Sequence, residues 1–78
     1  MVVPATLAKG IYRHFKGGLY EVVDTVINSE NLETMVLYRP LDSPYFWVRP
    51  YSMFCSTVER NGEVFRRFAF LKEREDPE

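Results

Sequence analysis

The stretch YRPLDSPYFWVRP, residues 38–50, decides the fold, because it contains two aromatic-rich segments that each end in Arg-Pro. Proline has no amide proton for a β-ladder, so each segment ends where no backbone donor is needed. If residues 41–44 form the loop, the segments pair with Tyr38 facing Trp47 and Val36 facing Arg49. The stretch therefore predicts an antiparallel hairpin.

This hairpin has two chemically different faces, because side chains alternate across a strand. One face is apolar, and we expect it to form the core: Met35, Leu37, Phe46 and Val48. The other face then points toward solvent: Val36, Tyr38, Trp47 and Arg49. A one-residue slip in register would exchange the two faces and bury Trp47.

The rest of the chain has turn residues every eight to twelve positions, between runs rich in Val, Ile, Tyr, Phe and Thr. That spacing is typical of an all-β fold. The predicted strands cover residues 10–15, 19–28, 33–39, 46–49, 55–60 and 63–70. We expect a small SH3-like barrel or roll of five or six antiparallel strands. A short 3₁₀ turn at residues 52–54 is expected to place Met53 and Phe54 on the open end of the barrel.

Two glycine-containing turns fix local register. Asn61-Gly62 suits a two-residue type I′ turn, which needs positive φ at both central positions. The flanking strands would then pair as follows: Arg60 with Glu63, Val58 with Phe65, and Cys55 with Phe68. Gly17-Gly18 predicts a second tight turn, between the first two strands.

Length and composition predict one domain. A chain of 78 residues has room for one core, and we expect residues 10–70 to form it, with flexible ends at 1–9 and 72–78. The formal net charge of -1 argues against a domain-wide basic surface for duplex DNA. No apolar run reaches the ~20 residues of a membrane span. The single cysteine, Cys55, has no partner for an internal disulfide, which suits a cytoplasmic protein.

Three segments together resemble a family of small bacterial proteins known as domain of unknown function 1653. They are YRHFKGGLYEV (residues 12–22), SENLETMVLYR (29–39) and WVRPYSMF (47–54). The ordered combination of H-x-K-G, Y-R, W-V-R-P and M-F is more specific than any single piece, and the resemblance extends from Gly10 to about Val58. It implies an SH3-like roll and brings no reaction or ligand. Asn31 and Pro40 depart from the pattern, which affects the loops around them.

The residues expected to form a ligand-binding surface combine aromatic rings with guanidinium groups, which dominate binding hot spots. The predicted set is Tyr12, His14, Tyr38, Arg39, Trp47 and Arg49, with Lys16 and Glu30 at its rim. The alternative is structural: Trp47 fills the core, and Arg49 forms an internal ion pair with Glu21 or Glu30.

His14 is the only histidine and hence the best general-base candidate. No nucleophile elbow, second histidine or diagnostic carboxylate pair accompanies it, and one His and one Cys in different strands make a poor metal site. We therefore predict no catalytic residue, no metal and no cofactor.

The function predicted from these features is a non-enzymatic binding module for an unknown peptide or protein. We expect the chain to be a monomer or a weak homodimer and to have no membrane partner. A nucleotide or single-stranded nucleic-acid module is the first alternative, and it requires Arg13, Lys16, Arg39 and Arg49 to gather on one side. A small enzyme that uses His14 is the second.

Overall fold

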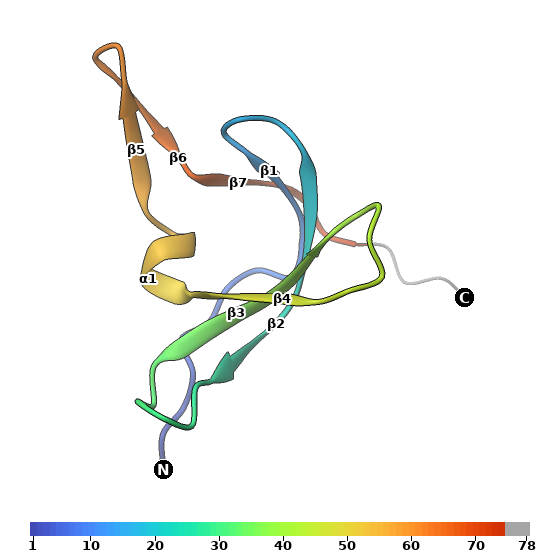
Figure 1. Cartoon of the computed structure of the whole chain (residues 1–78), viewed down its shortest axis with the longest axis vertical. Coiled ribbons are helices and arrows are strands. Elements are labelled where there is room, and N and C mark those ends of the chain that lie inside the picture. The colour runs from blue at the N-terminus through green and yellow to red at the C-terminus, as the bar shows by residue number, and fades with distance from the viewer. Residues whose placement is uncertain (75–78) are drawn as a thin grey trace.

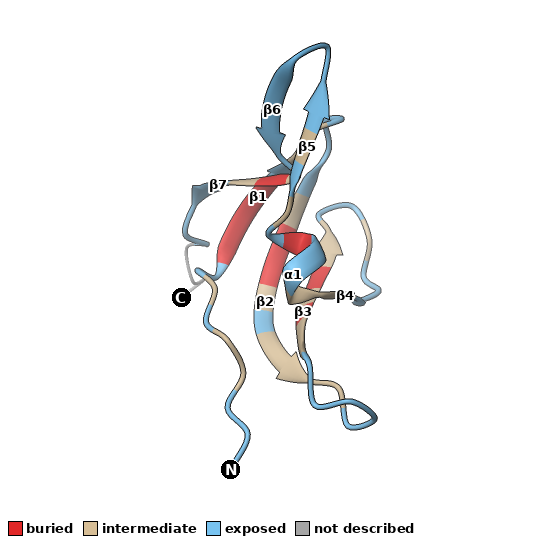
Figure 2. Ribbon diagram, turned by 90° about the vertical axis from the view of Figure 1, so that its left-hand side faces the viewer, coloured by how far each residue is buried: buried red, intermediate tan, exposed pale blue. Residues whose placement is uncertain are grey.

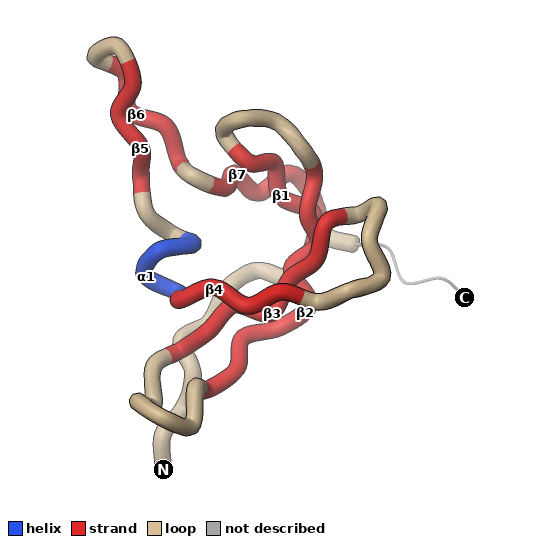
Figure 3. The backbone as a smooth tube through the Cα atoms, in the orientation of Figure 1, coloured by secondary structure: helices blue, strands red, loops and turns tan. Residues whose placement is uncertain are grey.

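The structure, a computed structural model, describes residues 1–74 and is almost entirely β (Figures 1 and 3). Its elements are β1 (Gly10–His14), β2 (Leu19–Ile27), β3 (Thr34–Pro40), β4 (Trp47–Pro50), α1 (Tyr51–Phe54), β5 (Thr57–Arg60), β6 (Glu63–Arg66) and β7 (Phe68–Lys72). The all-β prediction is confirmed. Five predicted strands match within a few residues, and the predicted sixth strand is divided at Arg67 into β6 and β7.

The strands form two antiparallel sheets. The larger has the order β4-β3-β2-β1-β7, and the smaller is the β5–β6 hairpin. Within residues 1–74 no ladder joins the edge strands β4 and β7, so closure into a barrel is not shown. Figure 1 shows the β5–β6 hairpin extending away from the larger sheet.

The large sheet curves because extra residues interrupt its ladders. The β2–β3 register shifts between Val22 and Asp24, and the β1–β7 register shifts between Ile11 and Tyr12. Such bulges bend a strand and increase its twist. The curvature gives the sheet an inner face and an outer face, and α1 packs against the inner one.

The core lies on this inner face, where Figure 2 shows buried segments of β1, β2, β3 and α1. It is built mainly from aromatic rings. Phe54 of α1 stacks on Phe68 of β7, with ring centroids 4.1 Å apart and an interplanar angle of 4°. Tyr12 and Tyr38 meet Phe54 edge-on at 5.5 and 5.4 Å. Val22 and Val36 complete the buried cluster.

The predicted strand pairing from residue 35 to 50 is confirmed, but the predicted direction of its faces is wrong. Tyr38 does pair with Trp47 and Val36 with Arg49. Tyr38 and Val36, however, are buried at 2% and 0% exposure, whereas Phe46 and Val48 are exposed. The apolar face is therefore the outer one.

Tyr38 can be buried because its hydroxyl has a polar partner, the Nε of Arg49, which donates to it over 3.2 Å. A buried tyrosine hydroxyl without such a partner would cost free energy. Side-chain polarity alone therefore predicts the wrong face as the core. The largest rings, rather than the purely aliphatic side chains, fill the inner space.

The turns agree in most details with those predicted from the sequence. Asn61 and Gly62 have φ values of 53° and 80°, as a type I′ turn requires, and Arg60–Glu63 and Val58–Phe65 pair as predicted. The predicted Cys55–Phe68 pair is wrong, because β5–β6 pairing ends at Thr57–Arg66 and Phe68 instead pairs with His14.

The predicted 3₁₀ turn is a single α-helical turn, closed by the amide of Cys55, which donates to the carbonyl of Tyr51 over 3.0 Å. Only one of its two predicted core residues is buried. Phe54 enters the core, while Met53 is 52% exposed.

The segment before β1 contacts the body of the fold. The amide of Ala5 donates to Oγ1 of Thr34 over 2.9 Å, and the Tyr12 hydroxyl donates to the carbonyl of Ala8 over 2.6 Å. Flexibility of residues 1–9 and 72–78 stays a prediction, and residues 75–78 lie outside the described part. No helix within residues 1–74 is long and apolar enough to cross a membrane.

The stacked pair predicts a steep cost for removing either ring. We expect Phe54→Ala to lower the free energy of unfolding by about 3–5 kcal/mol, because it leaves a cavity in the aromatic cluster. Phe46→Ala is the matched control, since Phe46 is 58% exposed, and we expect a change within about 0.5 kcal/mol. Urea denaturation of both variants measures the difference. Equal losses would contradict the assignment of the inner face as the core.

Candidate functional site

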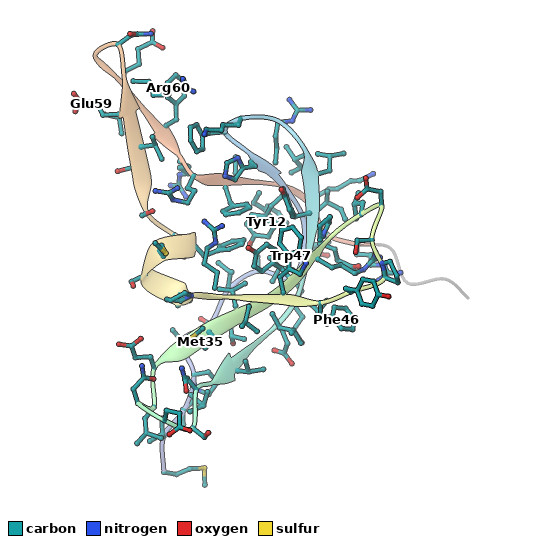
Figure 4. All side chains as sticks on the ribbon, in the orientation of Figure 1. Tyr12, Met35, Phe46, Trp47, Glu59 and Arg60 are labelled. Carbon is teal, nitrogen blue, oxygen red and sulfur yellow. The ribbon has the colours of Figure 1, made fainter. Side chains whose placement is uncertain are left out.

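The inner face carries more than the core. Toward β4 and the β1–β2 turn its side chains become partly exposed, and there they combine aromatic rings, a guanidinium and an imidazole. We call this region the aromatic–arginine surface: His14, Tyr20, Trp47 and Arg49 are partly exposed, and Tyr38 is buried directly beneath them. In Figure 4, Trp47 lies on the side of β4 that faces Tyr12, and Phe46 lies on the other.

Trp47 is on the inner face but is not sealed in the core. Its ring packs against Tyr38 at 6.0 Å and Tyr20 at 6.2 Å, yet 46% of the residue remains exposed. The ring is exposed because β4 is an edge strand, and no strand lies on its other side to cover Trp47. Exposure of Trp47 was predicted, although on the opposite face.

Arg49 is held in place by contacts that leave its charge uncompensated. Its Nε donates to the Tyr38 hydroxyl, and its guanidinium lies over the Phe68 ring, 5.5 Å from the centroid. Among residues 1–74 it forms no ion pair, so the alternative pairing with Glu21 or Glu30 is wrong for the described chain.

Arg39, in contrast, has a structural role on the outer face. Its Nε and Nη2 reach Oε1 of Glu21 at 2.9 and 2.8 Å, and its Nη1 donates to the Ser43 carbonyl over 3.0 Å. Arg74 pairs with the other carboxylate oxygen of Glu21. A carboxylate as buried as Glu21, at 3% exposure, needs such partners. Arg39 therefore anchors the β3–β4 loop and is not part of the aromatic–arginine surface.

His14 lies between two rings, 4.7 Å from Phe15 and 4.9 Å from Phe68. Its Nδ1 accepts a hydrogen bond of 3.1 Å from the Lys16 amide, so the neutral ring carries its proton on Nε2. Desolvation by burial lowers the pKa of His14, and the positive charges of Arg49, Arg67 and Lys16 lower it further. No carboxylate of the described chain is among its hydrogen-bond or ion-pair partners.

Metal ligands and nucleophiles are scarce around this surface in the described part of the chain. Within residues 1–74, no group of three or more His, Cys, Asp and Glu side chains could hold a metal ion. Cys55 is exposed, as a free thiol. His14 has neither a nucleophilic side chain nor an orienting carboxylate among its described hydrogen-bond and ion-pair partners.

The structure thus brings five predicted residues to one side of the sheet: Tyr12, His14, Tyr38, Trp47 and Arg49. Tyr12 belongs to the core beneath the surface. Lys16 lies at the rim, with its Nζ 5.7 Å from the Phe15 centroid. Glu30 lies in the β2–β3 turn, at the opposite end of β2 from the β1–β2 turn (Figure 1). The predicted rim therefore contains Lys16 but not Glu30.

Three residues were missed: Tyr20, which belongs to the surface, and its neighbours Phe68 and Arg67. Tyr20 could have been found, because the Gly17-Gly18 turn pairs it with Tyr12 on the same face. Arg67 gave no signal, since its position depends on the break between β6 and β7.

A match to a protein-family profile identifies the family of this chain. Residues 10–70 match the profile of a family described as "Protein of unknown function (DUF1653)". The chain belongs to the DUF1653 family. The predicted resemblance is therefore confirmed. The match covers β1 to most of β7, and so includes every residue of the aromatic–arginine surface.

The fold recurs in a solved relative. A crystal structure of a DUF1653 protein from Bordetella bronchiseptica is similar with a TM-score of 0.78, and the match covers 91% of this chain and 95% of that one. Sequence identity is 24%, so the likeness concerns the fold. No curated protein matches this DUF1653 chain significantly.

The surroundings of His14 predict how its proton affects stability. The unfolded chain takes up a proton near the ordinary pKa of 6.5, but the fold lowers the pKa of His14. The folded state therefore binds fewer protons below that pH, and the free energy of unfolding falls as the pH drops from about 6.5 through the lowered pKa.

The ring protons of the single histidine, followed by NMR, measure this pKa directly. We expect a midpoint below 6.5, an increase of that midpoint in Arg49→Gln, and loss of this part of the pH dependence of stability in His14→Gln. A midpoint above 6.5 would contradict the electropositive setting described for His14.

Proposed function

We propose that this DUF1653 chain is a non-enzymatic binding module whose aromatic–arginine surface holds a peptide or protein segment. One observation carries the proposal: Trp47 remains 46% exposed beside Arg49, whose charge has no acidic partner in residues 1–74. Tryptophan and arginine supply contact area, stacking and directed donors to a ligand. An edge strand next to these side chains also offers backbone groups to an extended chain.

Two features favour a peptide over the alternatives. For nucleic acid, the expected gathering of Arg13, Lys16, Arg39 and Arg49 is absent, because Arg39 pairs with Glu21 on the outer face. For an enzyme, His14 lacks a carboxylate among its described partners. We also infer a cytoplasmic setting and a monomer or weak homodimer. The lone Cys55 and the small size of the surface support these two points.

Selection of short random peptides on the immobilised chain tests the proposal. We expect the wild type and Phe46→Ala to enrich one common motif, because Phe46 is exposed on the other side of β4. We expect Trp47→Ala and Arg49→Gln to weaken binding of that motif at least about tenfold, as loss of a hot spot does. Calorimetry measures the affinities, and circular dichroism checks that each variant is folded.

Two results would contradict the proposal. One is the absence of any enriched motif. The other is an enriched motif that binds Trp47→Ala as tightly as the wild type while Phe46→Ala loses it.

A further inference from the structure

A second arginine lies beside the aromatic–arginine surface and was not predicted. Arg67 occupies the break between β6 and β7, where the chain passes from the projecting hairpin to the large sheet. Its amide donates to the Ser56 carbonyl and its carbonyl accepts from the Phe15 amide, both over 3.0 Å. The backbone of Arg67 is therefore fixed between the residue that precedes β5 and the residue that follows β1.

The side chains of Arg49 and Arg67 are oriented in the same manner. Each donates its Nε to a hydroxyl of the fold: Arg49 to Tyr38 over 3.2 Å, and Arg67 to Oγ of Ser56 over 2.9 Å. Neither Nη group has a protein acceptor in the hydrogen bonds of residues 1–74, and neither guanidinium has an acidic partner there. Both forks are thus positioned by the fold and can donate to a ligand.

The His14 ring lies between these two forks. Arginines lie over both rings that flank it: Arg49 is 5.5 Å from the Phe68 centroid, and Arg67 is 6.0 Å from the Phe15 centroid, which Arg60 also approaches at 5.9 Å. The hydrogen bond from the Lys16 amide engages only Nδ1 of His14 and leaves Nε2 available to a ligand. Lys16 adds a further positive charge at the rim, 5.7 Å from the Phe15 centroid.

A cluster of cationic donors without acidic partners in residues 1–74 is unusual in a chain with a net charge of -1. Arg39 and Arg74, by comparison, converge on Glu21, and Lys9 reaches Asp24 at 3.8 Å. Around His14 no carboxylate of the described chain performs that role. An anionic ligand would relieve the mutual repulsion of these positive charges.

We propose that His14, Arg49 and Arg67 form an anion subsite for a phosphoryl group carried by the bound peptide. Two guanidinium forks and one imidazole match three oxygens better than the two of a carboxylate, and a phosphate monoester carries about -1.5 to -2 charges at neutral pH. The inference rests on the proposed function, because it places the phosphorylated side chain at one end of the same surface. Trp47 and Tyr20 would then contact the residues next to it.

The first arm of the test needs no peptide and uses inorganic phosphate. Phosphate in this subsite stabilises protonated His14, so we expect the pKa of His14, read from its ring protons, to be higher in phosphate than in chloride at equal ionic strength. Arg49→Gln and Arg67→Gln should abolish the increase, and a melting curve shows whether each is folded. No phosphate-specific increase in folded wild type would overturn the inference.

The second arm compares a selected peptide that carries phosphoserine, phosphothreonine or phosphotyrosine with the same peptide unmodified. We expect at least about a tenfold preference for one phosphorylated form, with most of it lost in Arg67→Gln. Equal binding of both forms would overturn the subsite and leave the peptide-binding proposal standing. Adenosine monophosphate, bound more tightly than any phosphopeptide, would instead assign the phosphoryl group to a nucleotide and overturn the peptide source.

Arg13→Gln is the matched control. It removes the same charge from the residue beside His14, but Arg13 is exposed and alternates to the outer face of β1. We expect it to keep both the pKa increase in phosphate and the phosphopeptide preference. Arg13 lines a hollow beside the β1–β2 turn, together with Lys16 and Gly17. Loss of both effects in Arg13→Gln, with both retained in Arg67→Gln, would move the anion to that hollow and contradict the inner site.

Discussion

The aromatic stack between Phe54 and Phe68 is the contact on which the rest of this DUF1653 fold depends. It joins α1, which follows β4, to β7, which pairs with β1, and so connects the two ends of the five-stranded sheet across its inner face. Tyr12 and Tyr38 then pack against the same pair. A curved sheet of this size can bury a core only when something covers its concave side.

The same stack determines where function can reside. Because α1 covers the centre of the inner face, the rings nearer β4 and the β1–β2 turn lack a cover. Trp47 is left partly exposed, while Arg49 and Arg67 are fixed by hydrogen bonds to Tyr38 and Ser56. The core and the candidate site are therefore continuous, and the polar groups that make burial of Tyr38 possible also present a guanidinium to a ligand. A chain of 78 residues can in this way place the proposed site directly beside its core.

Much of the fold was predictable from sequence, because turns and register are local properties. Asn61-Gly62, Gly17-Gly18 and the loop after Pro40 fixed three hairpins, and the pairing of Tyr38 with Trp47 followed from the last of them. The direction of the faces did not follow. Both faces of β3 and β4 carry apolar side chains, so alternation defines two sets without saying which is inside. That choice depends on Phe54 and Phe68, which are remote in sequence. Arg39 and Arg49 were likewise alike in sequence, and only the buried Glu21 distinguishes them.

The central claim is that the indole of Trp47 is accessible and lies in a positive field on the inner face. Because the chain has one tryptophan, quenching of its fluorescence by iodide, caesium and acrylamide measures both properties at once. The account predicts partial quenching by acrylamide and much stronger quenching by iodide than by caesium, with that preference reduced in Arg49→Gln. Quenching by caesium equal to or greater than that by iodide, or no quenching by any of the three, would contradict it.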